Sequence, residues 1–330
     1  MNSVWFNLLF LIIGFILVVK GGDYFVSSAV SLAKKTQIPA VIIGATIVSI
    51  ATTLPELLVS LISSINGQFE MAVGNAVGTI IANISLICGI SIIFLPMAVK
   101  KTSNIKYYIL IFLSVFLLIC GINFGIDWYE SLILLLIFVG FIVINVMEAR
   151  KEMKTFPQEE DEDFMESKEE IMPWKKIIPL FLIGALSIGF GAMTMVNTAS
   201  NLAKFIGVSE EFISLTIIAL GTSLPELTTT IIAIRKKESS LGYGNIIGAN
   251  IINSSLLMGA TGLVAGTSLP MTKQTVWISM PLMLIVTCIF ILPLIFKSKT
   301  YRWQGIILLI LYCAYIVFLI LSTLGIVLVK

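Results

Sequence analysis

Stretches of apolar residues long enough to cross a membrane recur along almost the whole of this 330-residue chain. A helix needs about 20 consecutive apolar residues to span a bilayer. Runs of this kind predict ten spans, near residues 4–33, 39–65, 70–97, 105–123, 128–148, 174–203, 211–234, 241–266, 274–296 and 303–328. Only 12% of the residues are charged, against about 25% in soluble domains. The sequence therefore predicts an all-α polytopic membrane protein.

The connections between these spans alternate in charge. One set holds most of the basic residues, among them Lys34, Lys35, Lys100, Lys101, Arg150, Arg235, Lys236, Lys297 and Arg302. The other set holds only Lys204, Lys273 and the terminal Lys330. By the positive-inside rule the first set faces the cytoplasm, so both termini are expected to be extracellular. The acidic segment 150–172 is then cytoplasmic, and because it lacks the spacing of an EF-hand we interpret it as a solvated linker.

This linker separates two copies of one pattern, offset by 170 residues. The matching pairs are Thr52 and Thr222, Pro55 and Pro225, Glu56 and Glu226, Gly74 and Gly244, Gly78 and Gly248, Asn83 and Asn253, and Gly89 and Gly259. The predicted halves are residues 1–149 and 173–330, with the shared signature at 44–90 and 214–260. Each half has an odd number of spans, so the second must enter the membrane in the opposite orientation. Inverted repeats with helices interrupted at corresponding positions indicate a secondary transporter with a site at the midplane.

Each copy carries a proline and a carboxylate in the middle of an apolar run, Thr52-Thr53-Leu54-Pro55-Glu56-Leu57 and Thr222-Ser223-Leu224-Pro225-Glu226-Leu227. An interior proline removes a hydrogen-bond donor and is expected to break its helix, which frees the carbonyls of Ala51 and Gly221. The carboxylate follows the threonine by one helical turn, so the two side chains share a helical face. Hydroxyl, free carbonyl and carboxylate oxygens are the ligands that Ca²⁺ and Na⁺ prefer. The motifs therefore predict discontinuous helices that form a cation site inside the membrane.

The two carboxylates are expected to be functional. A charged side chain at the bilayer centre costs at least ~2.5 kcal/mol, so it is retained for a reason. Glu56 and Glu226 have no lysine or arginine in the interior of their spans, which argues against a structural ion pair.

Polar residues on the span that follows each carboxylate form a stripe along one helical face. The stripe consists of Asn75, Thr79 and Asn83 in the first copy and of Asn245, Ala249 and Asn253 in the second. Asn83 and Asn253 are expected to reach the site because they lie deeper in the span. For Asn75 and Asn245, a direct ligand role and a hydrogen bond between helices are both open.

At these residues the chain resembles the Ca²⁺/cation antiporter superfamily, and within it the sodium/calcium exchangers of prokaryotic type. The family signature reads Gly-Thr-Ser-Leu-Pro-Glu-Leu and, further on, Gly-Asn-x-x-Gly-Ser. Residues 221–227 match the first part, residues 244–249 match the second except at Ala249, and the first copy is slightly looser. The resemblance implies ten helices in two inverted repeats, and Ca²⁺ export driven by Na⁺ entry.

The resemblance also implies which residues hold the ions. Ca²⁺ would be held by Thr52, Glu56, Thr222 and Glu226. Na⁺ would additionally use Ser49, Thr53, Thr79, Asn83, Ala219, Ser223 and Asn253, with Ser49 and Ala219 acting through their backbone carbonyls. Ala249 stands where the motif has serine, which leaves the number of Na⁺ ions open, and the neutral Asn253 argues against a K⁺ requirement.

Other functions fit these residues less well. A Ca²⁺/H⁺ antiporter of the same fold is the alternative, although the chain has no histidine and lacks the acidic residue usual after the Gly-Asn motif of that branch. A channel would need an open path, and an enzyme would need a nucleophile–base pair or a metal centre that the sequence does not offer. We therefore expect a transporter, not an enzyme, with no cofactor and no nucleic-acid partner. Its expected partners are Ca²⁺, Na⁺ and the lipid bilayer of a prokaryotic plasma membrane, in which it acts as a monomer or weak homo-oligomer.

Overall fold

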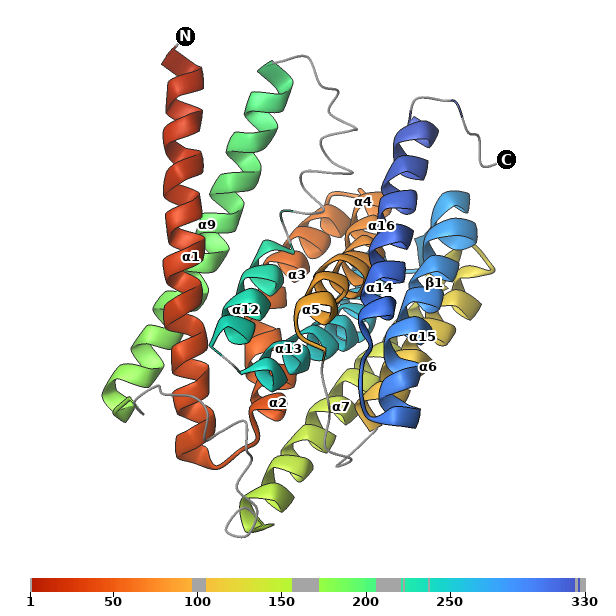
Figure 1. Ribbon diagram of the computed structural model, residues 1–330. Helices are drawn as coiled ribbons and strands as arrows, with labels where there is room; N and C mark the ends of the chain where they lie inside the picture. The colour runs from red at the N-terminus through yellow and green to blue at the C-terminus, as the bar shows by residue number, and fades with distance from the viewer. Residues whose placement is uncertain are drawn as a thin grey trace.

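The computed structural model describes residues 2–96, 105–155, 172–205, 221, 223–236, 238–323 and 326, and these are almost entirely helical (Figure 1). Eight helices among them are long and apolar enough to cross a membrane, and a ninth apolar helix, Ile105–Gly121, is shorter. The span expected near 211–234 is described only at residue 221 and from residue 223 onward. The predicted all-helical membrane fold is confirmed, and most predicted span ends lie within a few residues of the observed ones.

The elements follow the same order in both halves, where η marks a π-helical segment. The first half contains α1 (Asn2–Thr36), α2 (Ala40–Ile43), η1 (Gly44–Val48), α3 (Ser49–Ile65), α4 (Phe69–Ala82), η2 (Asn83–Cys88), α5 (Gly89–Phe94), α6 (Ile105–Gly121), β1 (Gly125–Asp127) and α7 (Trp128–Thr155). The second contains α9 (Trp174–Phe205), α12 (Leu224–Arg235), α13 (Ser239–Ile252), η4 (Asn253–Leu257), α14 (Met258–Ala265), β2 (Ser268–Pro270), η5 (Thr275–Ser279), α15 (Met280–Lys297) and α16 (Arg302–Thr323).

The repeat is visible in the ends of these elements. Helix α13 begins and ends 170 residues after α4, and the π-helical segments η2 and η4 begin at Asn83 and Asn253, again 170 residues apart. The two halves therefore share their local backbone geometry as well as their sequence pattern.

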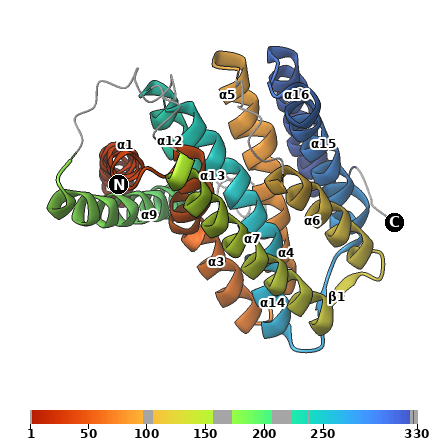
Figure 2. The same cartoon turned by 90° about the horizontal axis from the view of Figure 1, so that it is seen from below.

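Helices α1 and α9 lie side by side at one end of the molecule, beside the bundle formed by most of the other helices (Figures 1 and 2). Their contact is made by glycines. A Cβ atom on Gly14 would lie 2.9 Å from the carbonyl oxygen of Gly191, and one on Gly184 would lie 2.8 Å from that of Gly21. Because hydrocarbon offers helices no hydrophobic driving force, close packing over small residues of this kind holds them together in a membrane.

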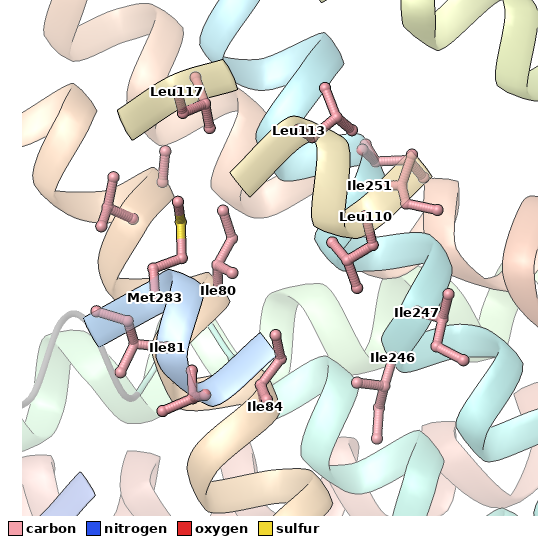
Figure 3. Packing of buried hydrophobic residues seen from close by; sticks show 14 of the residues in the cluster. Ile80, Ile81, Ile84, Leu110, Leu113, Leu117, Ile246, Ile247, Ile251 and Met283 are labelled. Atoms are coloured by element: carbon pink, nitrogen blue, oxygen red, sulfur yellow. The ribbon is translucent and has the colours of Figure 1, made fainter. Parts of the chain in front are cut away.

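The larger hydrophobic core lies between helices of both halves. Figure 3 shows Ile80, Ile81 and Ile84 of α4 and η2 near Leu110, Leu113 and Leu117 of α6, Ile246, Ile247 and Ile251 of α13, and Met283 of α15. At one end of the bundle, β1 pairs antiparallel with β2, with Gly125 opposite Pro270. Side-chain packing and this short ribbon thus tie the first half to the second, and the motif helices α3, α4, α12 and α13 lie within that assembly.

Candidate cation site

Two buried carboxylates define the centre of the candidate site. Glu56 lies on α3 and Glu226 lies in the first turn of α12, and neither side chain has any exposed surface. Each carboxylate acts electrostatically on the other, and Thr52 is the other side chain that acts most directly on Glu226. No carboxylate oxygen of either residue accepts a hydrogen bond from the part of the chain that the structure describes. Burying an unpaired charge costs several kcal/mol, so this pair calls for a positively charged occupant.

The two prolines affect their helices differently. Pro55 does not break its helix, contrary to the prediction, because α3 runs from Ser49 to Ile65 with Pro55 inside it. Membrane helices tolerate an interior proline where neighbouring groups satisfy the freed backbone atoms. The irregularity in the first copy is instead the π-helical η1, just before α3. In the second copy the helix α12 begins at Leu224, with Pro225 in the first turn, where no N–H is required.

Hydroxyl groups from α3 surround the start of the site. The Thr53 hydroxyl donates to the Ser49 carbonyl at 2.8 Å, and the Thr52 hydroxyl lies 3.3 Å from the same carbonyl. The Ser49 hydroxyl donates to the Asn245 carbonyl at 2.9 Å, across the boundary between the halves. Thr52, Thr53 and Ser49 are all buried. The Ser49 carbonyl, which the family resemblance assigns to Na⁺, thus already accepts a side-chain hydrogen bond.

Two π-helical segments carry the deeper asparagines. Asn83 is the first residue of η2 and Asn253 the first of η4, and both side chains are fully buried. A π-helical turn holds one extra residue, and such turns are frequent at functional sites. η2 packs on α12, which carries Glu226, and η4 packs on α3, which carries Glu56. Neither amide group has a hydrogen-bond partner among the described residues.

Contacts along α3 fix its register against the second half. Ser49 donates to the Asn245 carbonyl, and Ser64 donates to the Thr261 carbonyl at 3.0 Å. The sequence separations of these pairs are 196 and 197, so the two helical segments run parallel, and the extra residue of η4 accounts for the difference of one. This register places Ala249 at the height of Thr52 and Asn253 at the height of Glu56.

The remaining predicted ligands have different outcomes. Thr79 and Ser223 are buried, and their hydroxyls lack partners among the described residues. Thr222 and Ala219 lie outside the described residues, so their predicted roles remain predictions. Asn75 donates to the Glu56 carbonyl at 3.2 Å and to the Ser60 hydroxyl at 2.9 Å, which is the interhelical alternative for this residue.

The unsatisfied groups suit a hard cation. Six predicted site residues leave buried oxygen atoms without hydrogen bonds among the described residues: Glu56, Thr79, Asn83, Ser223, Glu226 and Asn253. These are carboxylate, hydroxyl and amide oxygens, the donors that Ca²⁺ accepts. Nowhere in the described ranges do three or more His, Cys, Asp or Glu residues gather into a cluster. The donor set is thus two carboxylates with neutral oxygens around them.

Two features of the site were not predicted from the sequence. The π-helical segments have no signature in residue type, since Asn83-Ile84-Ser85 and Asn253-Ser254-Ser255 read as ordinary helix. The hydrogen bond from Asn245 Nδ2 to the Thr229 hydroxyl, 2.9 Å, was also missed. Its only sequence signal is a hydroxyl one turn after Glu226 on a span that is otherwise apolar.

Comparisons with known proteins agree with this geometry. The family model described as sodium/calcium exchanger protein matches residues 6–147 and 176–321. The chain is 30% identical to an uncharacterized membrane protein of Methanocaldococcus jannaschii, over 92% of this chain and 94% of that protein. It is 29% identical to the sodium/calcium exchanger MaX1 of Methanosarcina acetivorans, over 95% and 98% of the two chains. A solved structure of the sodium-calcium exchanger NCX_Mj, soaked with Na⁺ and Sr²⁺, superposes with a TM-score of 0.82 at 29% identity, covering 95% of this chain and 99% of that one.

Proposed function

The chain belongs to the sodium/calcium exchanger protein family, and on this premise we propose that it exchanges Ca²⁺ for Na⁺ across a membrane by alternating access. Membership makes it an integral membrane cation antiporter and not an enzyme. The observation that carries the proposal of ions is the pair Glu56 and Glu226, fully buried, close to each other and without a hydrogen bond or ion pair among the described residues.

Charge balance explains why one site would serve both ions. Two ionised carboxylates carry two negative charges, which one Ca²⁺ or two Na⁺ ions neutralise. Because a buried uncompensated charge is costly, the empty site is unfavourable, and the ions replace one another rather than leave it vacant. A third Na⁺ would need neutral oxygens, such as those of Asn83 and Asn253, and would carry net charge across the membrane.

We assign the residues as follows. Ca²⁺ is held by Thr52, Glu56, Thr222 and Glu226. Na⁺ ions also use Ser49, Thr53, Thr79, Asn83, Ala219, Ser223 and Asn253. Support comes from the buried, unpaired oxygens that several of these residues present and from the packing of η2 on α12 and of η4 on α3.

The inverted repeat supplies the mechanism. Residues 1–149 and 173–330 form two units of opposite orientation around one midplane site, and movement of pseudo-symmetric parts can open that site to either side in turn. We place both termini outside the cell and the 150–172 linker in the cytoplasm, as the distribution of Lys and Arg indicates.

Competition between the ions tests the shared site. In proteoliposomes, raising Na⁺ on the side from which Ca²⁺ is taken up should raise the apparent Ca²⁺ KM and leave the maximal rate at saturating Ca²⁺ unchanged. A fall in the maximal rate with an unchanged KM would mean that the ions occupy separate sites.

A further inference from the structure

A chain of side-chain hydrogen bonds links the helix of Glu226 to the Thr52 hydroxyl. Thr229 lies one turn after Glu226 on α12, Asn245 lies on α13, and Thr52 lies on α3. The Asn245 amide nitrogen donates to the Thr229 hydroxyl at 2.9 Å, and the Thr52 hydroxyl donates to the Asn245 amide oxygen at 3.2 Å. All three side chains are buried, so this chain crosses from the second half to the first away from bulk water.

The backbone dictates the direction of each hydrogen bond. Carbonyl groups only accept, so the Thr229 hydroxyl donates to the carbonyl of Pro225 at 2.9 Å or to that of Glu226 at 3.1 Å. The Thr229 oxygen must then accept from Asn245, which turns the amide oxygen of Asn245 toward Thr52. The alternative acceptor for Thr52 is the Ser49 carbonyl, at 3.3 Å, which already accepts the Thr53 hydroxyl.

We propose that Thr229 and Asn245 are positioning residues that draw the Thr52 hydroxyl proton away from the cation, so that the Thr52 oxygen presents its lone pairs to Ca²⁺. The inference rests on the proposed function, in which Thr52 is a Ca²⁺ ligand. A hydroxyl can bind a cation only through its lone pairs, and a proton turned toward the ion or toward Glu226 would compete with it. Asn245 is not itself a ligand in this arrangement, because both ends of its amide are engaged.

A double-mutant cycle tests the proposal, with equilibrium binding of radioactive Ca²⁺ to the purified full-length protein as the readout. Thr229→Val keeps the shape of the side chain but removes the oxygen that accepts from Asn245. We expect it to weaken Ca²⁺ binding ~5-fold, the size of one net hydrogen bond, and Thr229→Ser to restore binding to within ~2-fold of wild type. In a Thr52→Val background the further effect of Thr229→Val should fall below ~2-fold, because the hydroxyl that it orients is gone.

Thr261→Val is the matched control. Thr261 is buried, and its hydroxyl donates to the carbonyl four residues back, at 2.8 Å, as that of Thr229 does, but it bonds to no residue of the site. Its substitution should leave Ca²⁺ affinity within ~2-fold of wild type. Melting temperatures and monodispersity identify any variant that does not fold, and if Thr229→Val is one of these, Asn245→Ala takes its place in the cycle.

The outcomes are distinct. If the wild-type protein binds no Ca²⁺, the proposed function fails and this inference fails with it. If the wild type binds Ca²⁺ but the loss caused by Thr229→Val is equally large with and without the Thr52 hydroxyl, Thr229 acts by another route and only the positioning role is wrong. Failure of Thr229→Ser to restore binding would also overturn it, since serine retains the hydroxyl.

Discussion

Replacing Glu226 by glutamine should separate the divalent ion from the monovalent one. The substitution keeps the volume of a side chain that has no exposed surface and removes one charge of the carboxylate pair. At an effective dielectric constant of about 20, two unit charges 4 Å apart interact with ~4 kcal/mol. Ca²⁺ therefore loses ~8 kcal/mol of attraction, while relief of the repulsion between Glu56 and Glu226 returns ~4 kcal/mol. The net loss of ~4 kcal/mol corresponds to a ~10³-fold weaker Ca²⁺ affinity.

The same estimate gives a different result for Na⁺. A single Na⁺ loses ~4 kcal/mol of attraction and regains about as much from the relieved repulsion, so the affinity for the first Na⁺ should change little. Equilibrium binding of radioactive Ca²⁺ and Na⁺ to Glu226→Gln and to wild type measures both numbers. Glu70→Gln is the control, because Glu70 is exposed in the first turn of α4. Equal weakening of both ions, or Ca²⁺ affinity within ~10-fold of wild type, would falsify the charge-balance reasoning.

Three further predictions follow from other parts of the structure. Glu56→Gln should abolish Ca²⁺ exchange as Glu226→Gln does, since each carboxylate supplies half of the charge; measurable Ca²⁺ uptake at the wild-type rate would contradict the pairing. Ala249→Ser should shift Na⁺ activation to lower concentration and alter the voltage dependence, because the register places residue 249 beside Thr52 and each extra charge that crosses gains about 2.3 kcal/mol per 100 mV. An unchanged Na⁺ activation and current–voltage relation would make Ala249 a packing residue. Glu148→Gln should lower the melting temperature, because it removes the carboxylate 3.0 Å from the nearly buried Lys106 ammonium, while the Ca²⁺ affinity of the folded fraction should be unchanged; an unchanged melting temperature would show that this ion pair is not stabilising.

The large-scale fold could be predicted from the sequence because a membrane imposes strict requirements on length and polarity. Helices such as α4 and α15 begin within a few residues of the predicted ends, since an apolar run must end where water begins. The repeat was equally accessible, because Glu56 and Glu226 keep one offset through every insertion of the loops.

Details that depend on packing could not be predicted. The expectation that Pro55 breaks its helix followed from the local rule for proline, and the rule failed because α3 is supported on both sides by neighbouring helices. The π-helical turns at Asn83 and Asn253 are set by how α4 and α13 cross other helices, which no residue type encodes. For Asn245 the sequence left two roles open, and its partners Thr52 and Thr229 became visible only when three helices were placed together.

Ca²⁺ uptake into proteoliposomes under separate Na⁺ and H⁺ gradients tests the central claim most directly. Vesicles loaded with Na⁺ and diluted into Na⁺-free medium at equal internal and external pH should accumulate Ca²⁺, and an outward H⁺ gradient without Na⁺ should drive no uptake above that of protein-free vesicles. The Glu56→Gln and Glu226→Gln proteins should show no uptake in either case. Uptake driven by the H⁺ gradient and indifferent to Na⁺ would contradict the exchange of Ca²⁺ for Na⁺ at the paired carboxylates.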